Sequence, residues 1–207
     1  MGWTYAVTNK AGQLNRAMII GNAEMIYGQL TGYGWTLKPI CAVLGNLEQE
    51  SGLNPAQTQL GYPVDDENGG YGLAQWTPAK KIFMWCEAQD YSTREGYYQV
   101  EAIETNAFTQ YRDTPHTDYP LTYSEFKVDT THSLEFLVKC WLVNYERAGI
   151  PALANRLRYA NEWYRYFEGQ EPPTPPEPPE PPEPYDPTGT KRMPVYMMIK
   201  YPNIRLC

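Results

Sequence analysis

The 207-residue sequence has little positive charge: 17 Lys and Arg stand against 24 Asp and Glu, giving a formal net charge of −7 at pH 7. No basic stripe interrupts its helical patterns, so we expect no nucleic-acid partner, because phosphate backbones are bound by clustered Lys and Arg. No stretch is long and apolar enough to cross a membrane. The opening M-G-W-T-Y-A-V-T-N-K has neither a positive start nor an apolar run, and we expect no signal peptide.

The sequence also has few side chains that could hold a metal. Its four cysteines are widely separated and form no C-x-x-C pair, and only two histidines are present. Zinc sites normally use closely spaced Cys and His ligands, so we expect neither a metal nor a cofactor. The scarcity of His also gives little support to a Cys–His hydrolase. We expect Cys41 and Cys140 to be buried, because both lie in apolar helical patterns.

Phenylalanine is scarce as well, with 5 Phe against 18 Tyr and 6 Trp. Rings with a polar edge suit sites that bind sugars or protein partners, but they also serve in cores where that edge finds a hydrogen bond. We expect the second role for most of them. A hydrophobic content of 42% is that of a globular chain, and the length allows one domain with appendages.

Helical patterns fill residues 1–170, which we expect to form one mainly α domain. The helices are expected at 13–30, 38–50, 77–86, 97–111, from 122, at 134–145 and at 153–167. T-Y-S-E makes a capping box between Thr122 and Glu125, and Thr77 and Pro78 are expected as the N-cap and first residue of their helix.

The composition changes after residue 170. Residues 171–187 hold ten of the 19 prolines, in E-P-P-x-P-P repeats that favour a polyproline II linker. Residues 188–207 contain Lys191, Arg192, Lys200 and Arg205 and no acid. This short basic segment could add a strand to a partner protein, or it has no structure of its own.

The helix at 38–50 carries the first candidate catalytic group. Ile40, Val43, Leu44 and Leu47 form its apolar stripe, and S-G-L-N-P ends it directly after Glu50. Apolar neighbours and the negative end of the helix dipole would both raise the pKa of that carboxyl, as a proton donor requires. The alternative is an ordinary solvated glutamate. Glu48 flanks the same stripe on the other side, so only the terminal position favours Glu50.

Residues 53–76 have turn chemistry instead of a helical period. A long irregular segment within a domain is often functional, and Asn68, Gly69 and Gly70 favour a small β-hairpin. Asp65 and Asp66 belong to the acidic cluster of this loop, where one could position a water or stabilise an oxocarbenium-like state. A solvated turn is the alternative.

Three segments, in this order, carry a resemblance: L-G-N-L-E-Q-E-S-G-L-N-P, G-G-Y-G-L-A-Q-W-T and N-Y-E-R-A-G-I-P. Together they resemble the tail lysozyme family of bacteriophages, which is related to goose-type lysozymes and lytic transglycosylases. The resemblance covers roughly residues 10–168 and implies a lysozyme-like helical domain. The linker and the basic segment lie outside it.

The resemblance implies a peptidoglycan glycan-strand hydrolase with Glu50 as the general acid. It also implies that Gln75 lines the sugar cleft, with Tyr71 and Gly72 on the same loop, and that Tyr145 lies near the site. We expect Ser51 to contact substrate, and Tyr71 and Trp76 to offer ring faces to sugars. Glu146 is a candidate second carboxylate; its alternatives are an ion pair with Arg147 or a helix cap.

We therefore expect cleavage of the MurNAc–GlcNAc β-1,4 bond by water, with a lytic transglycosylase that forms 1,6-anhydro ends as the alternative. A wall-binding tail component without turnover is a third possibility. The expected location is the phage tail, where the basic segment could contact other tail proteins. A lysis enzyme released from the host cytoplasm is the other location to consider.

Overall fold

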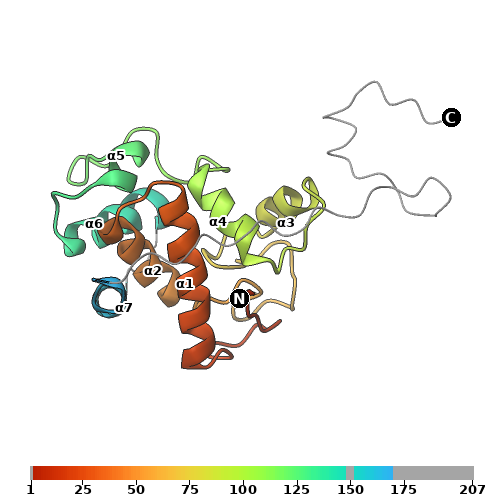
Figure 1. Cartoon of the computed structure of the whole chain (residues 1–207). Coiled ribbons are helices and arrows are strands. Elements are labelled where there is room, and N and C mark those ends of the chain that lie inside the picture. Colours follow the sequence, from red (N-terminus) through yellow and green to blue (C-terminus); the bar gives the residue numbers. More distant parts are fainter. Residues whose placement is uncertain (1, 148–151, 170–207) are drawn as a thin grey trace, which may run out of the picture.

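The computed structural model describes residues 2–147 and 152–169, and this part of the chain is mainly helical, as predicted (Figure 1). The predicted linker at 171–187 and basic segment at 188–207 lie outside the described residues. The helices are α1 (Arg16–Gly32), α2 (Leu37–Ser51), α3 (Lys80–Glu87), α4 (Gly96–Glu104), α5 (Tyr123–Val128), α6 (Leu134–Trp141), the π-helix η1 (Leu142–Glu146) and α7 (Leu153–Phe167).

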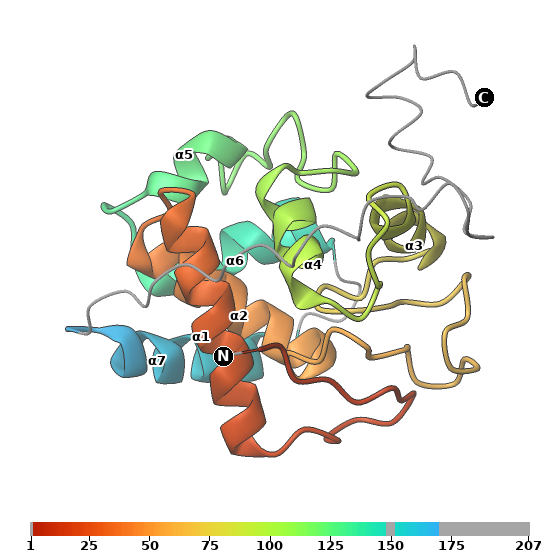
Figure 2. The same cartoon turned by 45° about the vertical axis from the view of Figure 1, so that its right-hand side comes forward.

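Helix α2 is the centre of the domain. It contacts α1, α6 and α7, and Figures 1 and 2 show it behind α1 with α7 alongside. The predicted stripe is fully buried, since Ile40, Val43, Leu44 and Leu47 have no exposed surface. The helix ends at Ser51 because Gly52 takes a left-handed conformation with φ of 62°, which costs a glycine little.

A glycine sets the spacing between α2 and α7. A Cβ atom on Gly45 would lie 2.6 Å from the backbone oxygen of Arg156 and 2.7 Å from the Cβ of Ala160. The two helices therefore touch nearly backbone to backbone. This close approach brings side chains of α7 to the C-terminal end of α2.

Aromatic side chains fill the core where α5 and α6 pack against α2. Trp35, Phe126 and Trp141 are buried, and Trp141 stacks on Tyr145 with ring centroids 4.0 Å apart. The expectation that most of the aromatic rings serve as core holds for this cluster.

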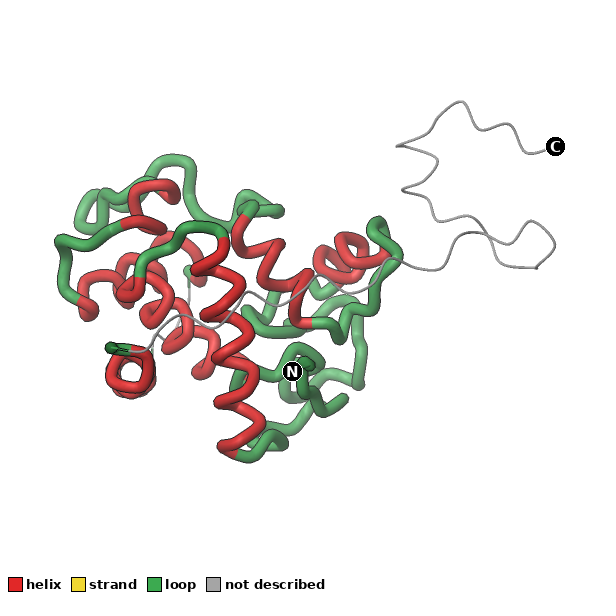
Figure 3. Tube along the Cα trace, in the orientation of Figure 1, coloured by secondary structure: helices red, strands yellow, loops and turns green. Residues whose placement is uncertain are grey.

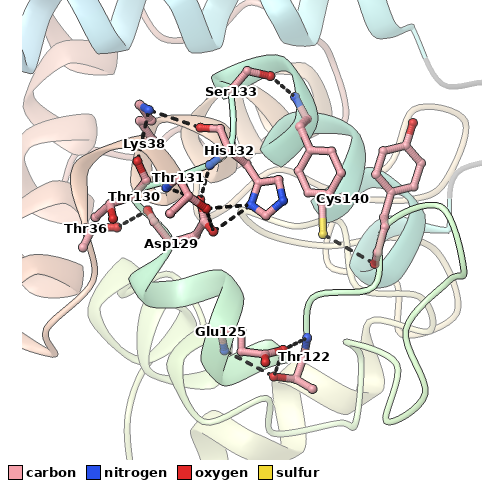
Figure 4. A network of polar contacts seen from close by, with 12 residues as sticks. Thr36, Lys38, Thr122, Glu125, Asp129, Thr130, Thr131, His132, Ser133 and Cys140 are labelled. Carbon is pink, nitrogen blue, oxygen red and sulfur yellow. Dashed lines mark hydrogen bonds and ion pairs between the residues drawn. The ribbon is translucent and has the colours of Figure 1, made fainter.

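The turn between α5 and α6 is tied to the start of α2 by polar contacts (Figure 4). Lys38 Nζ, in the first turn of α2, donates to the carbonyl of His132 in this turn at 3.1 Å.

The capping box predicted at the start of α5 is confirmed: Thr122 N donates to Glu125 Oε2 at 2.8 Å, and Glu125 N donates to Thr122 Oγ1 at 3.3 Å. These bonds stabilise the elements that surround α2.

Several helix boundaries differ from the prediction. The helix expected at 13–30 begins at Arg16 and ends at Gly32. The helix expected at 97–111 ends at Glu104, because Asn106 and Thr109 adopt positive φ values of 50° and 47°. The helix expected to begin at Pro78, with Thr77 as its N-cap, begins at Lys80, and the Thr77 hydroxyl donates to the Gln75 carbonyl instead of capping the helix. The helix expected at 134–145 changes to the π-helix η1 after Trp141.

The loop between α2 and α3 contains isolated β-bridges, and the described part of the chain has no strand (Figure 3). Thr58 pairs with Tyr71, so the chain reverses between them, where the glycine-rich hairpin was predicted. Tyr71 pairs in turn with Trp76. None of the helices in the described residues is long and apolar enough to span a membrane.

Candidate functional site

A groove of about 590 Å³ opens where the end of α2, the 52–79 loop, the start of α3 and the end of η1 meet. Polar side chains dominate its lining. The lining residues are Glu50, Gln59, Leu60, Ala74, Gln75, Thr77, Lys81, Gln110, Glu146 and Arg147. The groove therefore brings together a carboxylate from α2 and one from η1, from distant parts of the sequence.

Glu50 lies in the last turn of α2 and faces this groove, with 23% of its side chain exposed. Its Oε1 accepts a hydrogen bond from Nη2 of Arg156, which comes from α7 and is almost fully buried. The same guanidinium donates to Oδ1 of Asn46 at 3.0 Å. The sequence predicted apolar neighbours around Glu50; the structure instead places a buried cation beside it.

Glu146 is the last residue of η1 and is partly buried. Nε1 of Trp141 donates to its Oε1 at 2.9 Å. Burial and, second, the negative charge of Glu50 raise the pKa of Glu146 to about 8, although the Trp141 hydrogen bond and the charge of Arg156 act in the opposite direction. Glu146 is thus a carboxyl of this groove that favours its protonated form.

One alternative considered for Glu146, an ion pair with Arg147, is not formed in the described part of the chain. The guanidinium of Arg147 donates to the carbonyl of Gln110 at 2.9 Å, and no ion pair joins it to Glu146 in the described part of the chain. Arg147 itself ends the π-helix in a left-handed conformation with φ of 52°. π-Helical turns often occur at functional sites.

Glu48, the other acid of the α2 stripe, points away from the groove. It is buried against Arg16, whose Nη1 lies 2.9 Å from Oε1, and against Trp163, whose Nε1 donates to Oε2 at 2.7 Å. Burial raises the pKa of Glu48. Its contacts join α1, α2 and α7, so its role is structural, and the structure places Glu50 in the groove.

Gln75 lines the groove, and its own contacts explain how it is held. Its Nε2 donates to the carbonyls of Gln57 at 2.9 Å and Gly72 at 3.1 Å. Ser51 ties the end of α2 to the same loop, because its Oγ donates to the carbonyl of Leu73 at 2.9 Å. Ser51 does not line the groove, so it positions the loop beside Glu50.

Three aromatic residues expected near substrate are buried instead. Tyr71, Trp76 and Tyr145 are 0%, 2% and 1% exposed, so the prediction that Tyr71 and Trp76 offer ring faces to sugars is wrong. Nε1 of Trp76 donates to the Tyr145 hydroxyl at 3.2 Å, and this hydrogen bond joins the loop to η1. Gly72 is required for packing, since a Cβ there would lie 2.4 Å from Oε1 of Gln99 and its φ is +75°.

The acidic cluster of the loop also has other partners. Asp65 pairs with Arg94, with 2.7 Å between Oδ2 and Nη2. Asp66 Oδ1 accepts from the backbone N–H of Asn68 at 2.8 Å and of Gly69 at 3.2 Å. Neither carboxylate lines the groove, contrary to their candidate role. The structure brings Glu146 to Glu50 in their place.

Sequence reasoning missed Arg156, although a signal for it exists. Arg156 lies on α7 between Leu153 and Ala160, at the spacing of the apolar stripe of that helix. A charged residue on a buried stripe needs a partner of opposite charge, and Glu50 supplies it. Leu60, Lys81 and Gln110, which also line the groove, carry no such signal.

Comparisons with known proteins found a matching family and a relative. A family model described as phage tail lysozyme matches residues 21–167. The chain is also similar to "Morphogenesis protein 1" of Bacillus phage B103, with 31% identity over 153 residues that make up 72% of this chain. The matched region is 40% of the length of that relative.

Proposed function

Because this chain belongs to the phage tail lysozyme family, we propose that it cleaves the MurNAc–GlcNAc β-1,4 bond in the glycan strands of bacterial peptidoglycan. The observation that carries the proposal is a groove of about 590 Å³ in which Glu50 and Glu146 both line the wall. Enzymes that hydrolyse glycosidic bonds typically use a pair of carboxyl groups that flank the scissile bond.

In this proposal Glu50 is the general acid. The leaving oxygen of a glycosidic bond is a poor leaving group, so it needs a proton as the C–O bond breaks. The ion pair with Arg156 holds Glu50 in one orientation at the end of α2, where part of the side chain stays exposed to the groove. A water molecule then attacks the anomeric carbon.

The rest of the groove has the chemistry of a sugar site. The amides of Gln59, Gln75 and Gln110 can bind hydroxyl and N-acetyl groups, and Leu60, which is 76% exposed, offers an apolar surface. Lys81 adds a positive charge that suits the carboxylates of peptidoglycan peptide stems. We propose these contacts in place of the buried aromatic rings.

Glu50→Gln tests the acid. General acid catalysis contributes roughly 10²- to 10⁴-fold, so the variant should lose at least about 100-fold in the rate of wall clearance. It should still melt cooperatively, at a lower temperature than the parent, because Arg156 loses its charged partner. The matched control is Glu135→Gln, which removes an exposed carboxyl paired with Lys139 on α6. If Glu50→Gln clears cell walls at the parental rate, the assignment of Glu50 is wrong.

We further propose that the protein acts from the virion tail while the phage penetrates the host wall, with residues 188–207 contacting other tail proteins. The family description supports a tail location. Mass spectrometry of purified particles tests it: the chain should be present in stoichiometric amount. Its absence from particles, together with accumulation in the host cytoplasm before lysis, would identify a lysis enzyme instead.

A further inference from the structure

We propose that Glu146 is the second catalytic carboxyl of this groove and shares one proton with Glu50, so that the chain hydrolyses its substrate instead of forming an anhydro ring. The inference rests on the proposed function and decides between its two chemical outcomes. A transglycosylase needs one carboxyl, which serves as acid and then as base. A hydrolase that uses a water molecule benefits from a second.

The geometry places Glu146 for this role. The π-helical turn of η1 ends at Glu146 and directs it to the groove, where Trp141 fixes Oε1 by a hydrogen bond of 2.9 Å. Glu50 reaches the same groove from α2 and is fixed by Arg156. One oxygen of each carboxyl is thus held by a hydrogen bond, and both residues line the groove.

Burial of Glu146 and the charges around it keep this carboxyl protonated at neutral pH. Arg156 from α7 pairs with Glu50, and Lys81 from α3 and Arg147 after η1 also line the groove. Burial and the charge of Glu50 raise the pKa of Glu146 to about 8. Because burial disfavours a charge on Glu146, we place the proton of the groove on Glu146 in the free protein.

The proton that the reaction uses is supplied and recovered by Glu50 and Glu146. The proton moves from Glu146 to Glu50 when substrate binds, and Glu50 gives it to the departing O4 of GlcNAc as the C1–O4 bond breaks. The Glu146 carboxylate takes a proton from the attacking water, whose oxygen forms the new bond to C1 of MurNAc. Afterwards the pair again holds one proton, on Glu146, and no other reactant is needed.

The first test compares products and pH profiles for the parent, Glu146→Gln and the control Glu135→Gln. The parent should release reducing ends, and its kcat should fall above pH 8, where the pair loses its proton. Glu146→Gln should keep its fold by circular dichroism, lose at least about 100-fold in kcat, and lose the descending limb near pH 8. Glu135→Gln should match the parent.

The second test replaces the attack by activated water, which Glu146→Ala cannot carry out, by the attack of an added nucleophile. In Glu146→Ala the space left by the carboxyl admits azide, which attacks C1 without a base, and the assay is run in mildly acidic buffer so that Glu50 takes from solvent the proton that Glu146 would have supplied. We expect sodium azide to raise the rate at least about tenfold and to yield a MurNAc azide detectable by mass spectrometry. The same concentration of azide should not accelerate Glu50→Gln, because that variant lacks the acid.

The outcomes separate this inference from the proposed function. Anhydro ends from the parent, a Glu146→Gln variant that still forms reducing ends at the parental rate, or no azide product from Glu146→Ala would each overturn the role of Glu146 while glycan cleavage stands. A parent that releases no glycan fragment of any kind from purified peptidoglycan would overturn the proposed function itself.

Discussion

Replacement of Gly45 by alanine should destabilise the protein by separating α2 from α7. The new Cβ would lie 2.6 Å from the backbone oxygen of Arg156 and 2.7 Å from both the N and the Cβ of Ala160. Carbon atoms prefer contacts of about 3.5–4.0 Å, so the helices must move apart by several tenths of an ångström or more. Two of the three obstacles are backbone atoms, which a rotamer change cannot remove.

The expected magnitude is the difference between two effects. Overpacking of a close contact costs about 1–3 kcal/mol, and the backbone clash argues for the upper end. Alanine in place of glycine within a helix returns about 1 kcal/mol. We therefore expect Gly45→Ala to lower the free energy of unfolding by about 2 kcal/mol, which corresponds to a fall in Tm of roughly 4–8 °C for a domain of this size.

A matched control is available on α1. A Cβ on Gly21 would meet no atom within 4 Å, so Gly21→Ala should raise the unfolding free energy by up to about 1 kcal/mol. Chemical denaturation and thermal melting of the two variants measure the contrast. Gly45→Ala should also slow wall clearance, because the displaced backbone carries Arg156 and its contact with Glu50. A Gly45→Ala variant as stable as Gly21→Ala would refute the close approach of α2 and α7.

Three other measurements check the packing and charges. The pKa of Glu146 is raised to about 8 in the folded state, so the contribution of this residue to stability is lost as the pH rises towards that value. Above pH 8 the free energy of unfolding of Glu146→Gln should therefore be about 1–3 kcal/mol higher than that of the parent. Equal stability of the two proteins there would contradict the burial of this charge. Thr122→Ala should cost about 1 kcal/mol in urea denaturation, through loss of the capping box, and no change would mean that the cap is not formed. Cys41, Cys86 and Cys140 are buried thiols, and burial raises the pKa of each, so these three should react with a thiol reagent only after the protein is denatured. Peptide mapping identifies the labelled cysteines, and rapid labelling of any of these three in native buffer would count against this core.

Much of the architecture was predictable because it depends on local patterns. The spacing of Ile40, Val43, Leu44 and Leu47 identified α2 and its buried face, and the residues that follow Glu50 predicted where it ends. The T-Y-S-E capping box was predicted for the same reason, since its two partners are three residues apart. The expected mainly α fold is confirmed.

Predictions that depended on side-chain surroundings were less successful. Tyr71 and Trp76 lie in a glycine-rich loop that is typical of an exposed segment, yet the loop folds back on α3, and Tyr71 packs edge to face on Phe83 with 4.7 Å between ring centroids. Asp65 pairs with Arg94, which is 29 positions away in the sequence. The spacing of neighbouring residues in the sequence does not indicate such long-range contacts.

The identity and terminal position of the Glu50 carboxyl follow from the sequence, because a helix end and an apolar stripe are properties of neighbouring residues. Its surroundings come only from tertiary structure. Arg156 reaches Glu50 from 106 positions away, and a π-helical turn brings Glu146 to the same groove. Which of two carboxyls holds a proton depends on the charges and the burial around each, and these are set by helices that meet only when the chain has folded.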